Sequence, residues 1–194
     1  MPIGVVASSM ARIQVIDEAH GDGLLKEVYA EVAGKRGSIA NVFKVESLNP
    51  NVMRAHLNFY MAIMYGKSGL SRQHREMIAA TVSNGNGCLY CTTHHSEALS
   101  NYLKDLAAIQ AIKTDFGTAP IGPKEKAMLA YAVKLTKTPA AMNDADVGKL
   151  RQAGFSDSDI LDITFVASYF NFVNRLVLSL GVELEKGEER EYKY

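Results

Sequence analysis

The chain has 194 residues, of which 47% are hydrophobic and 22% are charged, a balance typical of a globular protein with a hydrophobic core. The 21 basic and 21 acidic residues give a formal net charge of zero, so no overall field favours nucleic acid or an anionic membrane as a partner. The N-terminus lacks the basic start of a signal peptide, and the apolar stretch from Ile163 to Asn174 is shorter than the roughly 20 residues that span a bilayer. We therefore expect a cytoplasmic protein.

Apolar residues recur at helical spacing along almost the whole chain. A first helix is expected from Leu24, with Gly34 at its end, and Ser71 is the expected N-cap of the third helix. The other helices are expected at residues 51–65, 72–83, 88–102, 124–137, 145–153 and 157–180. No segment alternates apolar and polar residues over the length of a strand, so the sequence predicts an all-α fold.

The ends of the helices have clear signals. Residues 84–87, Asn-Gly-Asn-Gly, are expected to break the chain sharply, because Asn and Gly tolerate positive φ. Asn143 with Asp146, and Ser156 with Asp159, have the spacing of a capping box with Asp in place of the usual Glu. The first signal separates the predicted helices 72–83 and 88–102, and the other two mark the starts of the predicted helices 145–153 and 157–180.

A single domain is expected over residues 1–194. Residues 1–48 would be a helical N-terminal extension, 49–182 the core and 183–194 a charged, solvated tail. The last helix, 157–180, is apolar on nearly all sides, so it is either central to the core or shared with a partner subunit. For a chain this small, a homo-oligomer is expected.

The two cysteines of the chain, Cys88 and Cys91, are three positions apart. A lone Cys-x-x-Cys in a cytosolic chain is a redox pair or half of a metal site rather than a disulfide framework. If a helix opens at Cys88, then Cys91 and His95 share its face. The first turn of a helix favours a thiolate, and His95 is placed to accept or relay a proton. These groups can attack a peroxide and close a disulfide.

Neighbours of this motif have different expected roles. His94 lies off the shared face and is expected at the surface, and Tyr90 points away from the cysteines on an ideal helix. Glu76 lines up with Ala80 and Ser83, small residues that let another helix approach closely. Partial burial there is expected to raise the pKa of the Glu76 carboxyl. An exposed Glu76 is the alternative.

Asn171, Asn174 and Arg175 share one face of the last predicted helix, at positions i, i+3 and i+4. Two interpretations fit this cluster. It either binds a substrate or forms buried hydrogen bonds at a contact between subunits.

The spacing of four residues resembles the motif of the AhpD-like alkylhydroperoxidase superfamily, which shares its fold with carboxymuconolactone decarboxylases. The motif is a glutamate, eleven other residues, Cys-x-x-Cys, three residues and a histidine. Its members here are Glu76, Cys88, Cys91 and His95. Residues 150–160 resemble a turn between helices of that fold, and residues 171–175 resemble a subgroup described as peroxidase-related. The resemblance extends from about residue 49 onward.

The resemblance implies an AhpD-like helical bundle that oligomerises as a trimer or hexamer. It also implies a peroxidatic Cys91, a resolving Cys88 and a proton relay through Glu76 and His95, with no cofactor and no metal. The helix dipole instead favours Cys88 as the more reactive thiol, because Cys88 is closer to the helix start. Tyr90 occupies the position between the cysteines where the peroxidase branch often has a histidine, so one titratable group is absent.

The function expected from these residues is that of a thiol-dependent peroxidase that reduces hydroperoxides. An external dithiol or a protein reductant would regenerate the thiols. The first alternative is a redox sensor or disulfide-exchange protein with the same residues and negligible turnover. A decarboxylase-like lyase and a small zinc-binding structural protein are weaker alternatives, because a lyase of that branch does not need the cysteines and no second Cys/His pair exists.

Overall fold

The computed structural model describes residues 10–185, and all regular structure in this range is helical. The all-α prediction is therefore confirmed for this part of the chain. Residues 1–9 and 186–194, which include most of the predicted charged tail, lie outside the described residues. The chain forms two compact units: one joins the N-terminal part up to Met61 with the part from Leu176 onward, and the other runs from Ala62 to Arg175.

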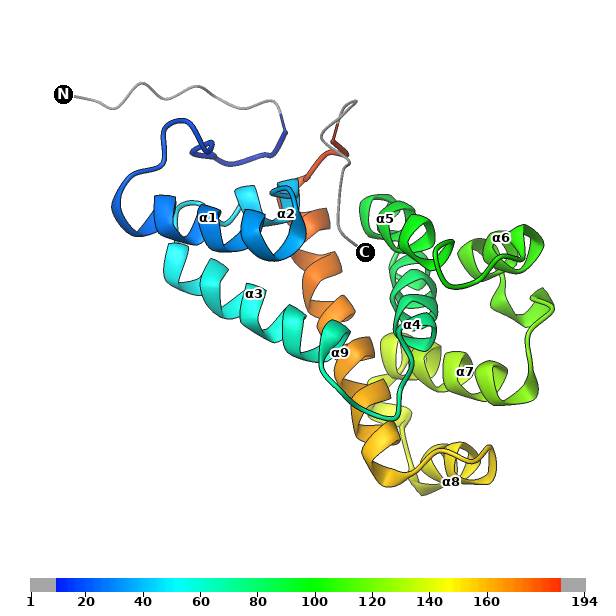
Figure 1. The fold of residues 1–194 in the computed structure, drawn as a ribbon. Coiled ribbons are helices and arrows are strands. Elements are labelled where there is room, and N and C mark those ends of the chain that lie inside the picture. The colour runs from blue at the N-terminus through cyan, green and yellow to red at the C-terminus, as the bar shows by residue number, and fades with distance from the viewer. Residues whose placement is uncertain (1–9, 186–194) are drawn as a thin grey trace. The chain divides into compact units, whose positions relative to one another are not determined.

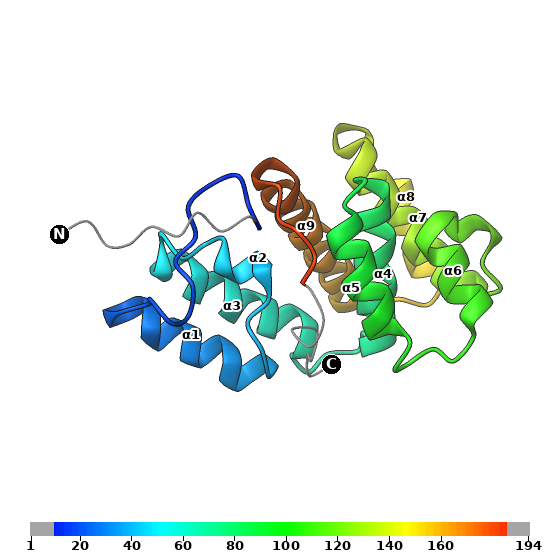
Figure 2. The same cartoon turned by 90° about the horizontal axis from the view of Figure 1, so that it is seen from above.

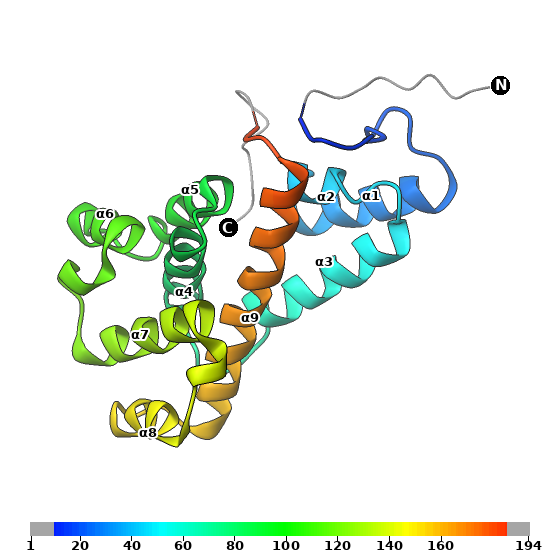
Figure 3. The same ribbon diagram turned by 180° about the vertical axis from the view of Figure 1, so that it is seen from behind.

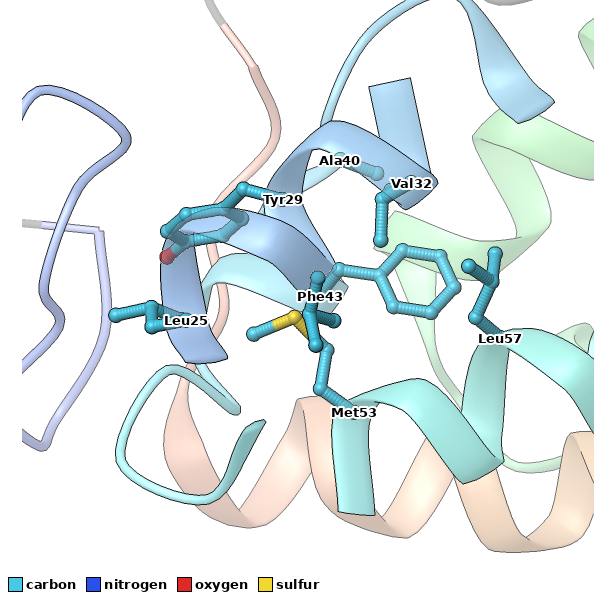
Figure 4. Packing of buried hydrophobic residues seen from close by; sticks show 8 residues of the cluster. Leu25, Tyr29, Val32, Ala40, Phe43, Met53 and Leu57 are labelled. Atoms are coloured by element: carbon cyan, nitrogen blue, oxygen red, sulfur yellow. The ribbon is translucent and has the colours of Figure 1, made fainter. Parts of the chain in front are cut away.

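In the first unit, α1 (Gly23–Arg36) and α3 (Pro50–Tyr65) lie side by side, with the short α2 (Asn41–Lys44) close to them (Figure 1). Their contact is apolar, and Figure 4 shows its centre. The buried side chains of this cluster are Leu25, Val28, Tyr29, Val32, Ala40, Phe43, Met53 and Leu57. The predicted end of the first helix at Gly34 is wrong, because α1 continues to Arg36 and Gly37 supplies the left-handed conformation, with φ of 89°, that ends it.

In the second unit, α4 (Arg72–Gly85) packs against α5 (Leu89–Leu99), α6 (Leu106–Thr114) and α7 (Pro123–Lys137). Figure 2 shows α4 and α5 side by side, and Figure 3 shows α8 (Asp144–Gln152) beyond α7. The sequence did not predict α6. The unit also contains most of α9 (Asp157–Leu180).

The helix ends follow the predicted signals in this unit. Ser71 accepts a hydrogen bond from the backbone N–H of His74, so it caps α4 as predicted. A capping box opens α8, and Ser156 and Asp159 form the second predicted pair at the start of α9. Gly87, with φ of 71°, turns the chain between α4 and α5. This short connection brings the two helices that carry the motif against each other.

By length and composition α9 could span a membrane. Within the second unit, however, one side of this helix is packed against protein, with Ile163, Val166 and Phe170 buried. The other side exposes an apolar stripe, which consists of Leu161, Phe165 and Phe172. The sequence predicted that this helix is either central to the core or shared with a partner subunit. Its buried side fits the first of these roles.

Candidate active site

The two thiols lie together at the start of α5. Cys88 is the N-cap residue and Cys91 lies in the first turn, and their Sγ atoms are 3.1 Å apart. Both are free thiols and both are buried. The backbone of Cys88 is fixed on two sides: its N–H donates to the Ser83 carbonyl oxygen (2.9 Å), and its carbonyl accepts from Thr92 Oγ1 (2.9 Å). The pair is therefore held in its reduced form at hydrogen-bonding distance.

The two thiols differ in acidity. A hydrogen bond from the Cys91 side chain lowers the pKa of Cys88, and this effect outweighs burial, which acts in the opposite direction. The same hydrogen bond raises the pKa of Cys91, with further increases from burial and from the charge on Cys88. The first proton that the pair releases therefore leaves a thiolate on Cys88, while Cys91 keeps its proton and needs a base.

Glu76 on α4 meets His95 on α5 inside the second unit. The Glu76 side chain is 0% exposed, and its Oε2 is 2.6 Å from Nδ1 of His95. Its other oxygen, Oε1, accepts from Arg72 at 2.7 Å from Nε. Although burial acts to raise the pKa of Glu76, the contacts with His95 and Arg72 outweigh it and lower that pKa. The predicted burial is confirmed, and the predicted rise in the pKa is wrong.

His95 is held as a neutral base. Burial lowers its pKa, and this outweighs the opposite effect of Glu76. With Nδ1 donating to the Glu76 carboxylate, the lone pair of a neutral ring lies on Nε2. The ring packs edge-on against Phe170 at 4.4 Å between centroids and stays 14% exposed. The arrangement provides an oriented imidazole whose free nitrogen can take up a proton.

Arg72 is a member of the site that the sequence did not reveal. Besides Glu76, its guanidinium donates to the Met64 carbonyl oxygen (3.2 Å) and lies 3.8 Å from the ring centroid of Tyr65. The spacing of Arg72 and Glu76, four positions apart on one helix, was the signal that could have indicated the pair. Arg72 adds to the effect of His95 in lowering the pKa of the buried Glu76 carboxyl.

The expectation for His94 is wrong. Its side chain is buried and packs against Tyr90, with ring centroids 4.5 Å apart. Tyr90, one turn earlier on α5, is buried as well, so this side of the helix is packed against protein rather than facing water. An ideal helix drawn from the sequence does not show which of its sides tertiary packing will bury.

Asn174 on α9 contacts Ser83, whose carbonyl oxygen accepts from the backbone N–H of Cys88. The Asn174 side chain is 0% exposed, donates from Nδ2 to Ser83 Oγ (3.0 Å) and acts to lower the pKa of Cys88 and of Cys91. Asn86 joins it to Asn171, because Asn86 Nδ2 donates to the Oδ1 atoms of both asparagines. The asparagines predicted to share a face thus form a hydrogen-bond network inside the second unit.

A zinc site would need several Cys, His, Asp or Glu side chains grouped around one point. Among residues 10–185, no group of three or more His, Cys, Asp and Glu side chains is placed to hold a metal ion. The two oxygens of Glu76 face His95 and Arg72. The site is thus arranged as a thiol pair beside a carboxylate–imidazole pair.

Residues 50–112 match the model of the carboxymuconolactone decarboxylase family. An uncharacterized peroxidase-related protein from Ralstonia eutropha JMP134, with an alkylhydroperoxidase AhpD core, is 31% identical over 93% of this chain and 95% of that chain, with a TM-score of 0.84. A peroxidase-related protein from Silicibacter sp. TM1040 is 30% identical over 92% and 93%, with a TM-score of 0.81.

The debrominase Bmp8, solved with 2,3,4-tribromopyrrole, is 19% identical and shares the fold over 96% of this chain and 95% of that chain, with a TM-score of 0.74. No curated protein matches the sequence. The first two structures are 31% and 30% identical over more than nine tenths of this chain, which indicates common descent. The chain belongs to the superfamily of AhpD-like alkylhydroperoxidases and carboxymuconolactone decarboxylases.

Proposed function

We propose that this protein is a thiol-dependent peroxidase that reduces hydroperoxides through Cys88 and Cys91. One observation carries the proposal: the sulfur atoms are 3.1 Å apart in the same compact unit as a buried Glu76–His95 pair joined at 2.6 Å. A nucleophile, a resolving thiol and an oriented base are the groups that thiol peroxidase chemistry requires. The peroxidase-related relatives support the same class of reaction.

In the proposed first step, Cys91 attacks the terminal oxygen of the hydroperoxide. Its thiol proton passes to Nε2 of His95, and the imidazolium then gives this proton to the departing alkoxide. The O–O bond breaks, an alcohol leaves and Cys91 becomes a sulfenic acid. The raised pKa of Cys91 means that this step depends on a base, which explains the role of a neutral His95 held by Glu76.

In the second step, the Cys88 thiolate attacks the sulfur of the Cys91 sulfenic acid. The S–O bond breaks, the leaving hydroxide takes a proton from solvent to form water, and a Cys88–Cys91 disulfide forms. The lowered pKa of Cys88 supports its role as the resolving thiol, because a more acidic thiol forms the attacking thiolate more readily. An external dithiol or a protein reductant then reduces the disulfide and is itself oxidised. The proposed cycle needs no metal, haem or flavin.

The proposal includes assembly into a homo-oligomer, a trimer or hexamer, in the cytoplasm. The apolar stripe of α9 supports assembly, since Leu161, Phe165 and Phe172 are between 42% and 53% exposed. Light scattering of the purified protein at several concentrations tests this part separately from the chemistry.

The decisive experiment measures peroxide consumption with a dithiol reductant under metal-free conditions, for the wild type and for Cys91→Ser and Cys88→Ser. We expect saturable turnover in the wild type and none in either variant. With a sulfenic acid trap, the Cys88→Ser protein should carry the label on Cys91 after one equivalent of peroxide. A label that forms on Cys88 in the Cys91→Ser protein at the wild-type rate would reverse the two roles.

The same experiment separates the alternative functions. Reversible oxidation of both thiols without turnover would replace the peroxidase by a redox sensor or disulfide-exchange protein. The lowered pKa of Cys88 at a helix start is the observation that favours this second candidate, because such a thiolate attacks disulfides efficiently.

A further inference from the structure

Asn174 lies where the thiol chemistry takes place, although it belongs to no part of the Glu-Cys-Cys-His motif. It comes from α9 and is completely buried. Its Nδ2 donates to Ser83 Oγ at 3.0 Å, and the carbonyl oxygen of Ser83 accepts from the backbone N–H of Cys88 at 2.9 Å. A carboxamide can present either an oxygen or an N–H group to a sulfur atom. Only the N–H group stabilises a thiolate, so the orientation of this one amide decides its effect.

The orientation of Asn174 follows from fixed groups elsewhere in the network. Asn171 contacts the Ala167 carbonyl oxygen, which can only accept, at 2.9 Å, and so its Nδ2 must face that carbonyl. Arg175, which can only donate, contacts Asn171 Oδ1 at 3.0 Å and fixes the same orientation from the other end. Asn171 therefore offers an oxygen to Asn86.

Asn86 transmits this orientation to Asn174. Since Asn171 Oδ1 is an acceptor, the group of Asn86 that reaches it at 3.1 Å must be Nδ2. The same Nδ2 reaches Asn174 at 2.9 Å, so the atom of Asn174 on that side is Oδ1. The Nδ2 group of Asn174 then lies on the opposite side, facing Ser83, the residue whose carbonyl oxygen holds the backbone N–H of Cys88.

We propose that Asn174 is the thiolate-binding residue of this site, and that Asn86 acts as a positioning residue which keeps the Asn174 N–H group facing the sulfur atoms. Of its two N–H bonds, one is taken by Ser83 and the second is available to the thiolate. Asn174 acts to lower the pKa of both cysteines, which agrees with N–H donation. The inference rests on the proposed function only in taking Cys88 and Cys91 as the reactive pair.

The test measures the thiolate itself and needs no peroxide turnover. The rate of Cys88 alkylation by iodoacetamide is followed against pH, with the site of labelling located by mass spectrometry. For Asn174→Ala we expect the alkylation rate below neutral pH to fall about tenfold, as for loss of one hydrogen bond to a charged group. The rate at high pH, where the thiol is ionised in both proteins, should be unchanged. An unaltered profile in a folded Asn174→Ala protein would overturn the proposal.

Asn86→Asp tests the orientation without a change in the buried core, because Asn86 is only partly buried at the C-terminal end of α4. A carboxylate facing Asn174 Oδ1 forces that amide to turn over, which presents an oxygen to the sulfur atoms. The alkylation profile should move in the same direction as in Asn174→Ala. Asn84→Asp is the matched control, since it adds the same charge two positions away on an exposed side chain. Equal shifts in the two Asp variants would overturn the positioning role.

Discussion

Glu76 Oε2 and His95 Nδ1 are 2.6 Å apart, although 19 positions separate the two residues along the chain. They meet because α4 and α5 pack against each other after the short turn at Gly87. The contact puts a fully buried carboxylate against an imidazole that retains some exposure to solvent. This geometry leads to predictions on activity, stability and pH dependence.

Glu76→Gln keeps the size of the side chain and removes its charge. The free energy of unfolding should fall by about 2 kcal/mol, since Arg72 loses a charged partner in a buried site. The rate of peroxide reduction should fall by about 10²-fold or more, because His95 loses the group that orients it. Urea denaturation and steady-state kinetics measure the two effects.

Glu125→Gln is the matched control, because Glu125 also contacts a histidine, His74, at 3.2 Å, outside the candidate site. This contact is partly exposed and its removal should change stability by less than about 1 kcal/mol. An equal loss of activity in both variants would mean that the Glu76–His95 pair has no special role.

The stability of the protein should fall as the pH decreases below the ordinary histidine value of 6.5. The pKa of His95 is lower in the folded protein, so the unfolded chain binds the proton first and acidification favours unfolding. Glu76, whose folded pKa also lies below its ordinary value of 4.5, adds a further loss at lower pH. Denaturation curves from pH 8 to pH 4 should show a weaker dependence above pH 5 for His95→Gln than for the wild type.

Arg72→Lys keeps the positive charge but removes the hydrogen bond from Nε to Glu76 Oε1 and the contact of the guanidinium with the Tyr65 ring. The pKa of Glu76 should rise, so the acid limb of the activity profile should move to higher pH, with a loss of stability of about 1 to 2 kcal/mol. The pH dependence of kcat/KM measures the first effect. Arg54→Lys, at a more exposed pair with Glu31, should leave the profile unchanged.

The local parts of this site could be predicted from the sequence, whereas contacts between distant helices could not. Ser71 as the cap of α4 and the break before Cys88 depend on neighbouring residues alone, and both were predicted correctly. His94 was placed wrongly because its burial depends on tertiary packing, which its position on an ideal helix does not reveal. The hydrogen bond from Asn174 to Ser83 joins α9 to α4, and helical periodicity contains no information about which helices meet.

The nine-residue α6 was missed for a different reason. It lies at Leu106–Thr114, and its N-cap Asp105 accepts a hydrogen bond from Ala108. The signal was present in the sequence as an Asp before an apolar segment, which is a usual helix start. A helix of this length has few repeats of its apolar pattern, so periodicity alone does not distinguish it from a loop.

Oxidation of the pair should leave the fold almost unchanged. The sulfur atoms need to approach from 3.1 Å to about 2 Å to form a disulfide, a small movement at a helix start. Cys88 makes no side-chain capping hydrogen bond to α5, so the disulfide removes no cap. The ring closed between positions 88 and 91 is short, and the gain in the free energy of unfolding should be no more than about 2 kcal/mol. Circular dichroism and thermal melts of the reduced and oxidised protein measure this, and a large loss of helix on oxidation would contradict a pair built to cycle between the two states.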